Sequence, residues 1–194
     1  MTERGNAYRC ARNAAVGLTA QLALALALAP TTAARAEPAG SVAAKQSLVL
    51  CDQVGELPAD DKIVALTRGL QLAEDALAAD DQDAKAHFAL FCNLGRQMQV
   101  TGVSFSSWST YRRLRRELDA TLALVPNDPD ALAAKGALLL HLPRLLGGDA
   151  AEAERLLRRA LDVEPGNTAA RRYLAEALEE RGASDQARAL LASR

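Results

Sequence analysis

Residues 118–129, LDATLALVPNDP, and residues 157–168, LRRALDVEPGNT, share one layout. In each stretch, apolar residues at helical spacing lead to a proline and a short polar turn, after which a new helical stretch begins. Pro126 corresponds to Pro165, at an offset of 39 residues. Self-similarity at such a period is typical of stacked helical units, so these two stretches decide the fold.

The composition also favours helices. Alanine and leucine are the commonest residues, whereas Val, Ile, Thr and the aromatic residues are scarce, so a β-sheet is not expected. Asp128 followed by Pro129, and Asn167 after Gly166, provide helix N-caps, and the short joints favour antiparallel neighbours. We therefore predict an all-α fold of antiparallel helix pairs, with helices at about 44–55, 60–79, 84–99, 107–124, 129–142, 150–163, 168–181 and 185–193.

The first residues have the pattern of a secretory signal peptide. Basic residues occur before an apolar run at 14–29, and Pro30 follows this run. An A-x-A pattern that ends at Ala36 predicts cleavage after this residue, with a periplasmic or secreted destination. The alternative is an uncleaved membrane anchor, but the apolar run is short for a membrane span and contains Gln21. Once cleavage removes this run, no stable membrane insertion is expected.

Cleavage divides the chain into a signal peptide at 1–36, a flexible leader at 37–44 and a helical repeat domain at 45–194. The domain keeps two cysteines, Cys51 and Cys92. In an oxidising compartment they can form a disulfide. The alternative is two separate buried thiols that act as small apolar side chains.

From Pro129 to Arg194 the chain resembles the tetratricopeptide repeat family. The resemblance is carried by a proline at the end of the second helix, Pro165, and by small residues at packing positions, such as Gly136, Ala153, Ala160, Ala175 and Ala187. The match is weaker at 60–125. One unit has about eleven extra residues around 102–108 and another about five around 142–149.

The resemblance implies a short right-handed superhelix of stacked helix pairs whose concave face binds a protein or peptide. A weaker resemblance is to the periplasmic repeat component of some tripartite solute transporters. Transferred position by position, the family's inner-helix sites predict a partner-binding groove with Phe88 as an apolar anchor. The predicted groove residues are Lys85, Phe88, Arg96, Asp130, His141, Arg172 and Glu176.

A second candidate site is the concentrated basic cluster of Arg112, Arg115 and Arg116 beside Trp108. Arginine binds carboxylate and phosphate groups in a bidentate manner, so this cluster could hold an acidic peptide, a carboxylated solute or anionic lipid headgroups. The alternative is a solvated helix face whose charges pair with Glu117 and neighbouring acids.

Catalysis is poorly supported by the sequence. Ser104 lacks the glycine and the preceding strand of a nucleophile elbow. His87 and His141 lack metal-ligand spacing, and a net charge of −1 argues against a nucleic-acid partner. We expect no enzyme activity, no cofactor and no metal.

The sequence therefore predicts an exported, non-catalytic scaffold for protein–protein interaction in the bacterial envelope. The alternative is a solute-binding or accessory component of a periplasmic transport system. A pocket lined by Trp108, Phe105 and the basic cluster would favour that alternative.

Overall fold

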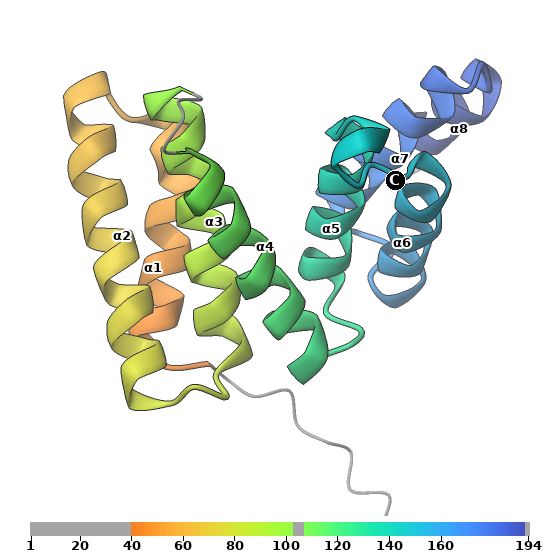
Figure 1. The fold of residues 1–194 in the computed structure, drawn as a ribbon. Coiled ribbons are helices and arrows are strands. Elements are labelled where there is room, and N and C mark those ends of the chain that lie inside the picture. Colours follow the sequence, from red (N-terminus) through yellow and green to blue (C-terminus); the bar gives the residue numbers. More distant parts are fainter. Residues whose placement is uncertain (1–39, 103–106, 193–194) are drawn as a thin grey trace, which may run out of the picture. The chain divides into compact units, whose positions relative to one another are not determined.

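The computed structural model describes residues 40–102 and 107–192. The predicted signal peptide, its cleavage site, Ser104, Phe105 and Arg194 lie outside these residues. The described residues form α-helices and short 3₁₀ turns, without a strand, which confirms the all-α prediction. The helices are α1 (Val42–Gln53), α2 (Ala59–Ala79), α3 (Ala84–Thr101), α4 (Ser107–Leu124), α5 (Pro129–His141), α6 (Ala150–Val163), α7 (Thr168–Glu180) and α8 (Ser184–Ala192) (Figure 1).

Polar side chains fix where the helices begin. Asp128 accepts the N–H of Ala131 at 2.9 Å, and Asn167 accepts the N–H of Ala170 at 2.8 Å, as predicted for N-caps. Helix α1 begins at Val42 and is capped by Ser41, so it includes the last residues of the predicted leader. The part of the leader before residue 40 lies outside the described residues.

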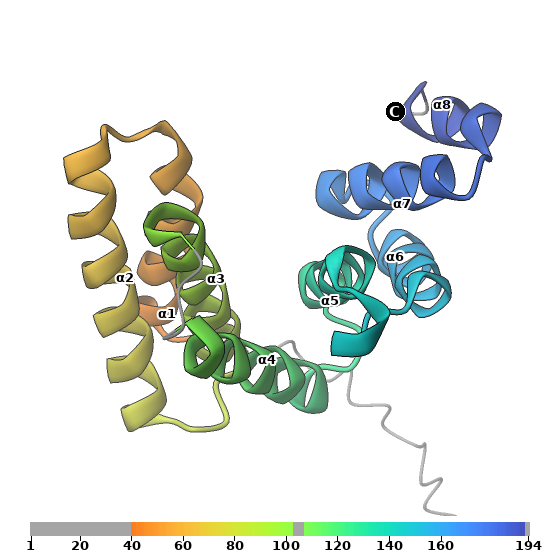
Figure 2. The same ribbon diagram turned by 45° about the horizontal axis from the view of Figure 1, so that its top comes forward.

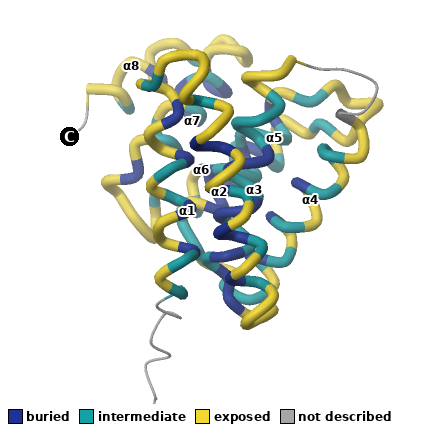
Figure 3. Tube along the Cα trace, turned by 90° about the vertical axis from the view of Figure 1, so that its left-hand side faces the viewer, coloured by how far each residue is buried: buried dark blue, intermediate teal, exposed yellow. Residues whose placement is uncertain are grey.

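The helices pack in two successive groups. In the first group, α1, α2 and α3 lie against one another and α4 packs on α3; in the second, α5, α6 and α7 do the same and α8 packs on α7. Helices α4 and α5 join the groups (Figures 1 and 2). Buried residues follow the helix faces that meet, and exposed residues cover the outer turns (Figure 3). This pattern is consistent with a tetratricopeptide-like stack of helix pairs.

Small residues let these helices approach closely. A Cβ atom added at Gly136 on α5 would lie 2.6 Å from Cγ of Leu157 on α6. Leu157 is fully buried, so the missing side chain at Gly136 provides the space for it. The structure thus explains the role of a position that the repeat pattern singled out.

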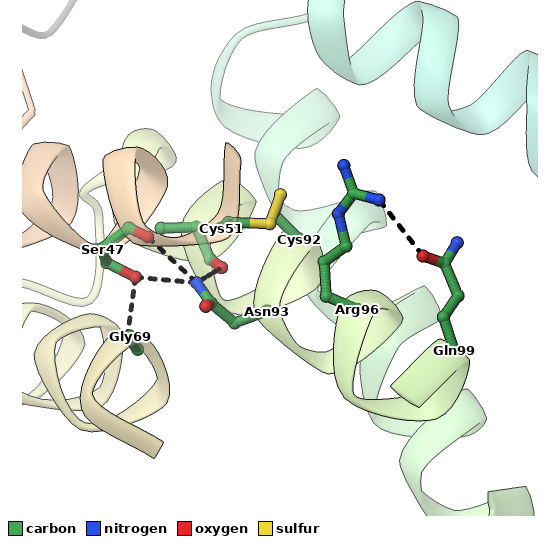
Figure 4. Close-up of a disulfide and its surroundings, with 8 residues drawn as sticks. Ser47, Cys51, Gly69, Cys92, Asn93, Arg96 and Gln99 are labelled. Atoms are coloured by element: carbon green, nitrogen blue, oxygen red, sulfur yellow. Dashed lines mark hydrogen bonds between the residues drawn. A yellow bond between two sulfur atoms is a disulfide. The ribbon is translucent and has the colours of Figure 1, made fainter. Parts of the chain in front are cut away.

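A buried polar network connects α1, α2 and α3. Ser47 Oγ donates to the carbonyl oxygen of Gly69 at 2.7 Å, and Asn93 Nδ2 donates to Ser47 Oγ at 3.0 Å (Figure 4). A Cβ atom at Gly69 would lie 2.2 Å from Asn93 Oδ1. A larger residue at this position would displace the Asn93 side chain from the network.

A disulfide lies beside this network. Cys51 on α1 is bonded to Cys92 on α3, with a Cα–Cα distance of 6.1 Å (Figure 4). The linked residues are 41 positions apart, and closing a loop of this length stabilises the fold by about 4 kcal/mol in the chain-entropy account. Of the two alternatives left open by the sequence, the structure has the crosslinked one.

Replacing both Cys51 and Cys92 with alanine should lower the free energy of unfolding by about 2–5 kcal/mol, because the unfolded chain loses its crosslink. Urea unfolding with and without a reductant measures this loss. The reductant should destabilise the wild-type protein and leave the double variant unchanged. Equal stability of oxidised and reduced wild type would contradict the prediction.

Candidate partner-binding groove

An open groove of about 570 Å³ lies between the two helix groups. Helices α1, α3 and α4 supply one wall, and α5 and α7, with the cap of α5, supply the other. The groove is lined by Leu48, Asp52, Lys85, Phe88, Phe91, Cys92, Gly95, Leu114, Asp128, Asp130, Ala134, Ala137, Leu138, His141, Ala169, Arg172 and Tyr173.

Contacts between α4 and α5 connect the two helix groups beside the groove. Leu138 on α5 packs against the core of the first group, and Leu122 on α4 packs against the core of the second. Lys135 Nζ donates to Asp119 Oδ1 at 2.8 Å across the same junction. These contacts hold the two helix groups together, and the groove between the groups remains open.

The wall on α3 is apolar. Phe88 and Phe91 are stacked with their ring centroids 5.6 Å apart, and both are half-buried. Leu114 on α4 is buried behind them in the same apolar cluster as Phe91. A stacked aromatic pair that remains partly exposed presents apolar area that a ligand can bury.

The wall on α5 and α7 combines small apolar residues with several polar side chains. His141 Nε2 contacts Glu176 Oε1 at 2.9 Å, and its ring meets the Tyr173 ring edge-on with centroids 5.7 Å apart. The guanidinium of Arg172 lies 4.5 Å from the centroid of the Tyr173 ring. Asp130 is occupied by Asn167, whose Nδ2 donates to it at 2.8 Å.

Two cations in the groove have no anionic partner among residues 40–102 and 107–192. Within the described residues, neither the ammonium group of Lys85 nor the guanidinium group of Arg172 forms an ion pair. Lys85 comes from the first helix group and Arg172 from the second. A ligand in the groove can therefore offer a carboxylate to either wall.

The structure brings together most of the residues predicted for the groove. Lys85, Phe88, Asp130, His141 and Arg172 line it, and Glu176 reaches it through its contact with His141. Arg96 does not line the groove.

The Arg96 guanidinium donates instead to Gln99 Oε1 at 3.3 Å on the same helix (Figure 4). Phe91 and Tyr173 were missed by the transfer of family positions. Phe91 could have been found from its i+3 spacing to Phe88, which places both rings on one helix face.

The predicted basic cluster lies away from this groove. Trp108, Arg112, Arg115 and Arg116, together with Tyr111 and Asp119, line a separate open depression of about 360 Å³ on α4. The rings of Trp108 and Tyr111 stack with centroids 5.5 Å apart. Phe105, which the solute-binding alternative also requires, lies outside the described residues.

The expected pairing of this cluster with Glu117 is corrected by the structure. Glu117 Oε2 contacts His87 Nδ1 at 2.7 Å instead, and Arg113, which is not part of the depression, pairs with Glu74 at 2.8 Å. His87 Nε2 also contacts the carbonyl oxygen of Asp81 at 3.0 Å. His87 is thus a structural residue that ties α3 to α4.

A comparison with protein-family models gives one match, to the tetratricopeptide repeat, over residues 144–193. This part of the chain, which contains α6, α7 and α8, is similar to that family. No curated protein matches the chain significantly.

The described residues contain no group of His, Cys, Asp and Glu side chains arranged to hold a metal ion. Among the helices of the described residues, none has both the length and the apolarity that a membrane span requires.

The His87–Glu117 pair is largely buried, whereas the His141–Glu176 pair is exposed, so the two should contribute differently to stability. Replacing His87 with alanine leaves Glu117, whose side chain is 14% exposed, without its partner, and should cost about 1–3 kcal/mol of unfolding free energy. Replacing His141 with alanine is the matched control, because its partner Glu176 is 41% exposed and the loss should be below about 1 kcal/mol. Urea unfolding measures both, and equal losses would contradict the interpretation.

Proposed function

We propose that the protein is an exported, non-catalytic scaffold whose groove binds an extended or helical segment of a partner protein. The observation that carries this proposal is the partly exposed Phe88–Phe91 pair in an open groove. Aromatic anchors in such grooves contribute most of the affinity of many peptide and protein interfaces. The similarity of residues 144–193 to tetratricopeptide repeats supports a role in protein–protein interaction.

The groove also indicates the chemistry of the segment. Apolar side chains of the partner pack on Phe88 and Phe91, and acidic groups reach the unpaired cations of Lys85 and Arg172. Because these cations lie in different helix groups, a segment that uses both bridges the two walls. The carboxylates of Asp52 and Asp130 disfavour an acidic group of the segment beside them.

Export is the second part of the proposal. It is supported by the pattern of residues 1–36 and by the disulfide between Cys51 and Cys92, since such crosslinks persist in oxidising compartments.

The groove is tested with a variant that carries Phe88→Ala and Arg172→Ala. The protein, fitted with a photo-crosslinker at Ala137 in the groove, is exposed to envelope extract. Crosslinked proteins are identified, and the affinity of the crosslinked segment is then measured by calorimetry. The variant should bind this segment at least about tenfold more weakly, because the aromatic anchor and one cation are lost.

The matched control carries Arg188→Ala and Leu191→Ala on α8, where both side chains are exposed and neither lines the groove. It should bind as the wild type does. Equal affinity of the groove variant and the control, with both folded by circular dichroism, would refute the groove. Crosslinking only to small carboxylated compounds would also refute it, in favour of solute binding.

Mass spectrometry of the protein recovered from the periplasmic fraction tests export. A mature chain that begins at Glu37 and carries the Cys51–Cys92 disulfide is expected. Recovery of the intact chain with free thiols from the cytoplasmic fraction would contradict it.

A further inference from the structure

A hydrogen-bonded turn between α5 and α6 exposes two leucines. This turn, the 3₁₀ segment Arg144–Leu146, carries Leu145, which is 99% exposed, and Leu146, which is 48% exposed. The N–H of Leu146 donates to the carbonyl oxygen of Pro143 at 2.8 Å and thereby closes the turn. Leu145 is therefore held out from the protein surface by a defined backbone structure.

Two glycines make this turn possible. Gly147 has a φ of +93°, which disfavours other residues, and a Cβ atom at Gly148 would lie 1.8 Å from the carbonyl oxygen of Leu142. The turn coincides with the extra residues that the sequence has at this place relative to the repeat pattern. The chain thus carries an insertion whose geometry projects apolar side chains into solvent.

Three exposed arginines line the depression on α4, and one of them, Arg115, reaches the turn. Arg112, Arg115 and Arg116 are exposed and share one helix face, and Arg115 Nη1 comes within 4.0 Å of the Cβ position at Gly147. Within the described residues, none of the three forms an ion pair. Asp119, the acid that lines the same depression, is already paired with Lys135.

An exposed aromatic residue completes this surface. Trp108 is 54% exposed, one helical turn before Arg112, and its ring stacks on Tyr111. Tryptophan favours the interface between lipid headgroups and acyl chains. Trp108 and the three arginines thus line one depression, and Arg115 connects this depression to the turn that carries Leu145 and Leu146.

We propose that this surface attaches the protein to an anionic lipid bilayer. We call it the arginine–leucine surface and define it by Trp108, Arg112, Arg115, Arg116, Leu145 and Leu146. Arginine donates paired hydrogen bonds to lipid phosphates, and leucine and tryptophan enter the region of the headgroups and upper acyl chains. The cations are concentrated here although the whole chain has a net charge of −1.

The protruding shape favours a bilayer over an acidic protein as the occupant. A protein partner binds best to an anchor that fills a matching pocket, whereas a bilayer accepts a projecting side chain at any rotation about its normal. The arginine–leucine surface shares no residue with the lining of the groove. The attachment therefore does not depend on the proposed scaffold function.

Sedimentation of the full protein with vesicles tests the attachment. One set of vesicles contains phosphatidylcholine alone, and the other also contains phosphatidylglycerol. A variant with Arg112→Gln, Arg115→Gln and Arg116→Gln should bind the anionic vesicles about a hundredfold more weakly, at about fivefold for each cation. Leu145→Ser should weaken the same binding about tenfold, because the inserted side chain becomes polar.

Matched controls separate this surface from general charge and hydrophobicity. Arg155→Gln, Arg158→Gln and Arg159→Gln on α6 remove the same charge, and Leu191→Ser removes a leucine that is 57% exposed on α8. Both controls should bind as the wild type does. Residues 1–36 are identical in every protein, so they cannot cause a difference in binding between the variants.

Three results would overturn the proposal. They are equal losses in the arginine variant and its control, unchanged binding of Leu145→Ser, and full displacement from the vesicles by inorganic phosphate at constant ionic strength. The last two would leave an anion site without bilayer insertion.

Discussion

Each helix pair of this protein depends on its neighbours, because a single pair cannot bury its own apolar side chains. Leu157 on α6 is fully covered only because Gly136 on α5 leaves room for it, and Leu174 on α7 adds to the same core. The interactions are local and repeat along the chain, as is typical of stacked helical units. A substitution that alters the packing of one helix pair therefore affects the burial of side chains in the neighbouring pairs first.

The same dependence explains why the groove occurs where it does. Helices α3 and α4 have 18 residues each, compared with 13 in α5 and 14 in α6, so the extra residues of this unit partly lengthen its helices. The junction to the next unit is then made mainly by α4 and α5, through Leu122 and Leu138. Where close stacking is relaxed, Phe88 and Phe91 stay partly exposed. The groove lies at this junction, with Phe88 and Phe91 on one side and His141, Arg172 and Tyr173 on the other.

The fold was predictable because its signals are local. Apolar periodicity, Asp128 and Asn167 as caps, and proline at the turns place the helices within a few residues of their observed bounds. The groove residues were predictable where their positions on the inner helices of the repeats place them on the concave face. Arg96 was misplaced because the lining of the groove includes Gly95 but not Arg96, whose guanidinium turns to Gln99.

Contacts between helices distant in sequence determine the partner of Glu117 and the need for a small residue at position 69. Glu117 has arginines on its own helix as possible partners, yet it pairs with His87 on α3, because the packing of α3 on α4 brings the two side chains together in a largely buried position. The glycine at position 69 has a similar explanation, since Asn93 from α3 occupies the space of its missing Cβ atom. Neither partner is near in sequence, so no local pattern could identify it.

Helix α4 separates the two proposed surfaces. Its buried side, with Leu114 and Leu118, faces the helix cores, and Leu114 also lines the groove. Its exposed side carries Arg112, Arg115 and Arg116. Because residues three and four apart share a helix face, the spacing that gathers the arginines also keeps them away from the groove. A bilayer on the exposed side therefore leaves the apolar wall of Phe88 and Phe91 accessible, and a partner segment can bind while the protein remains at the membrane surface.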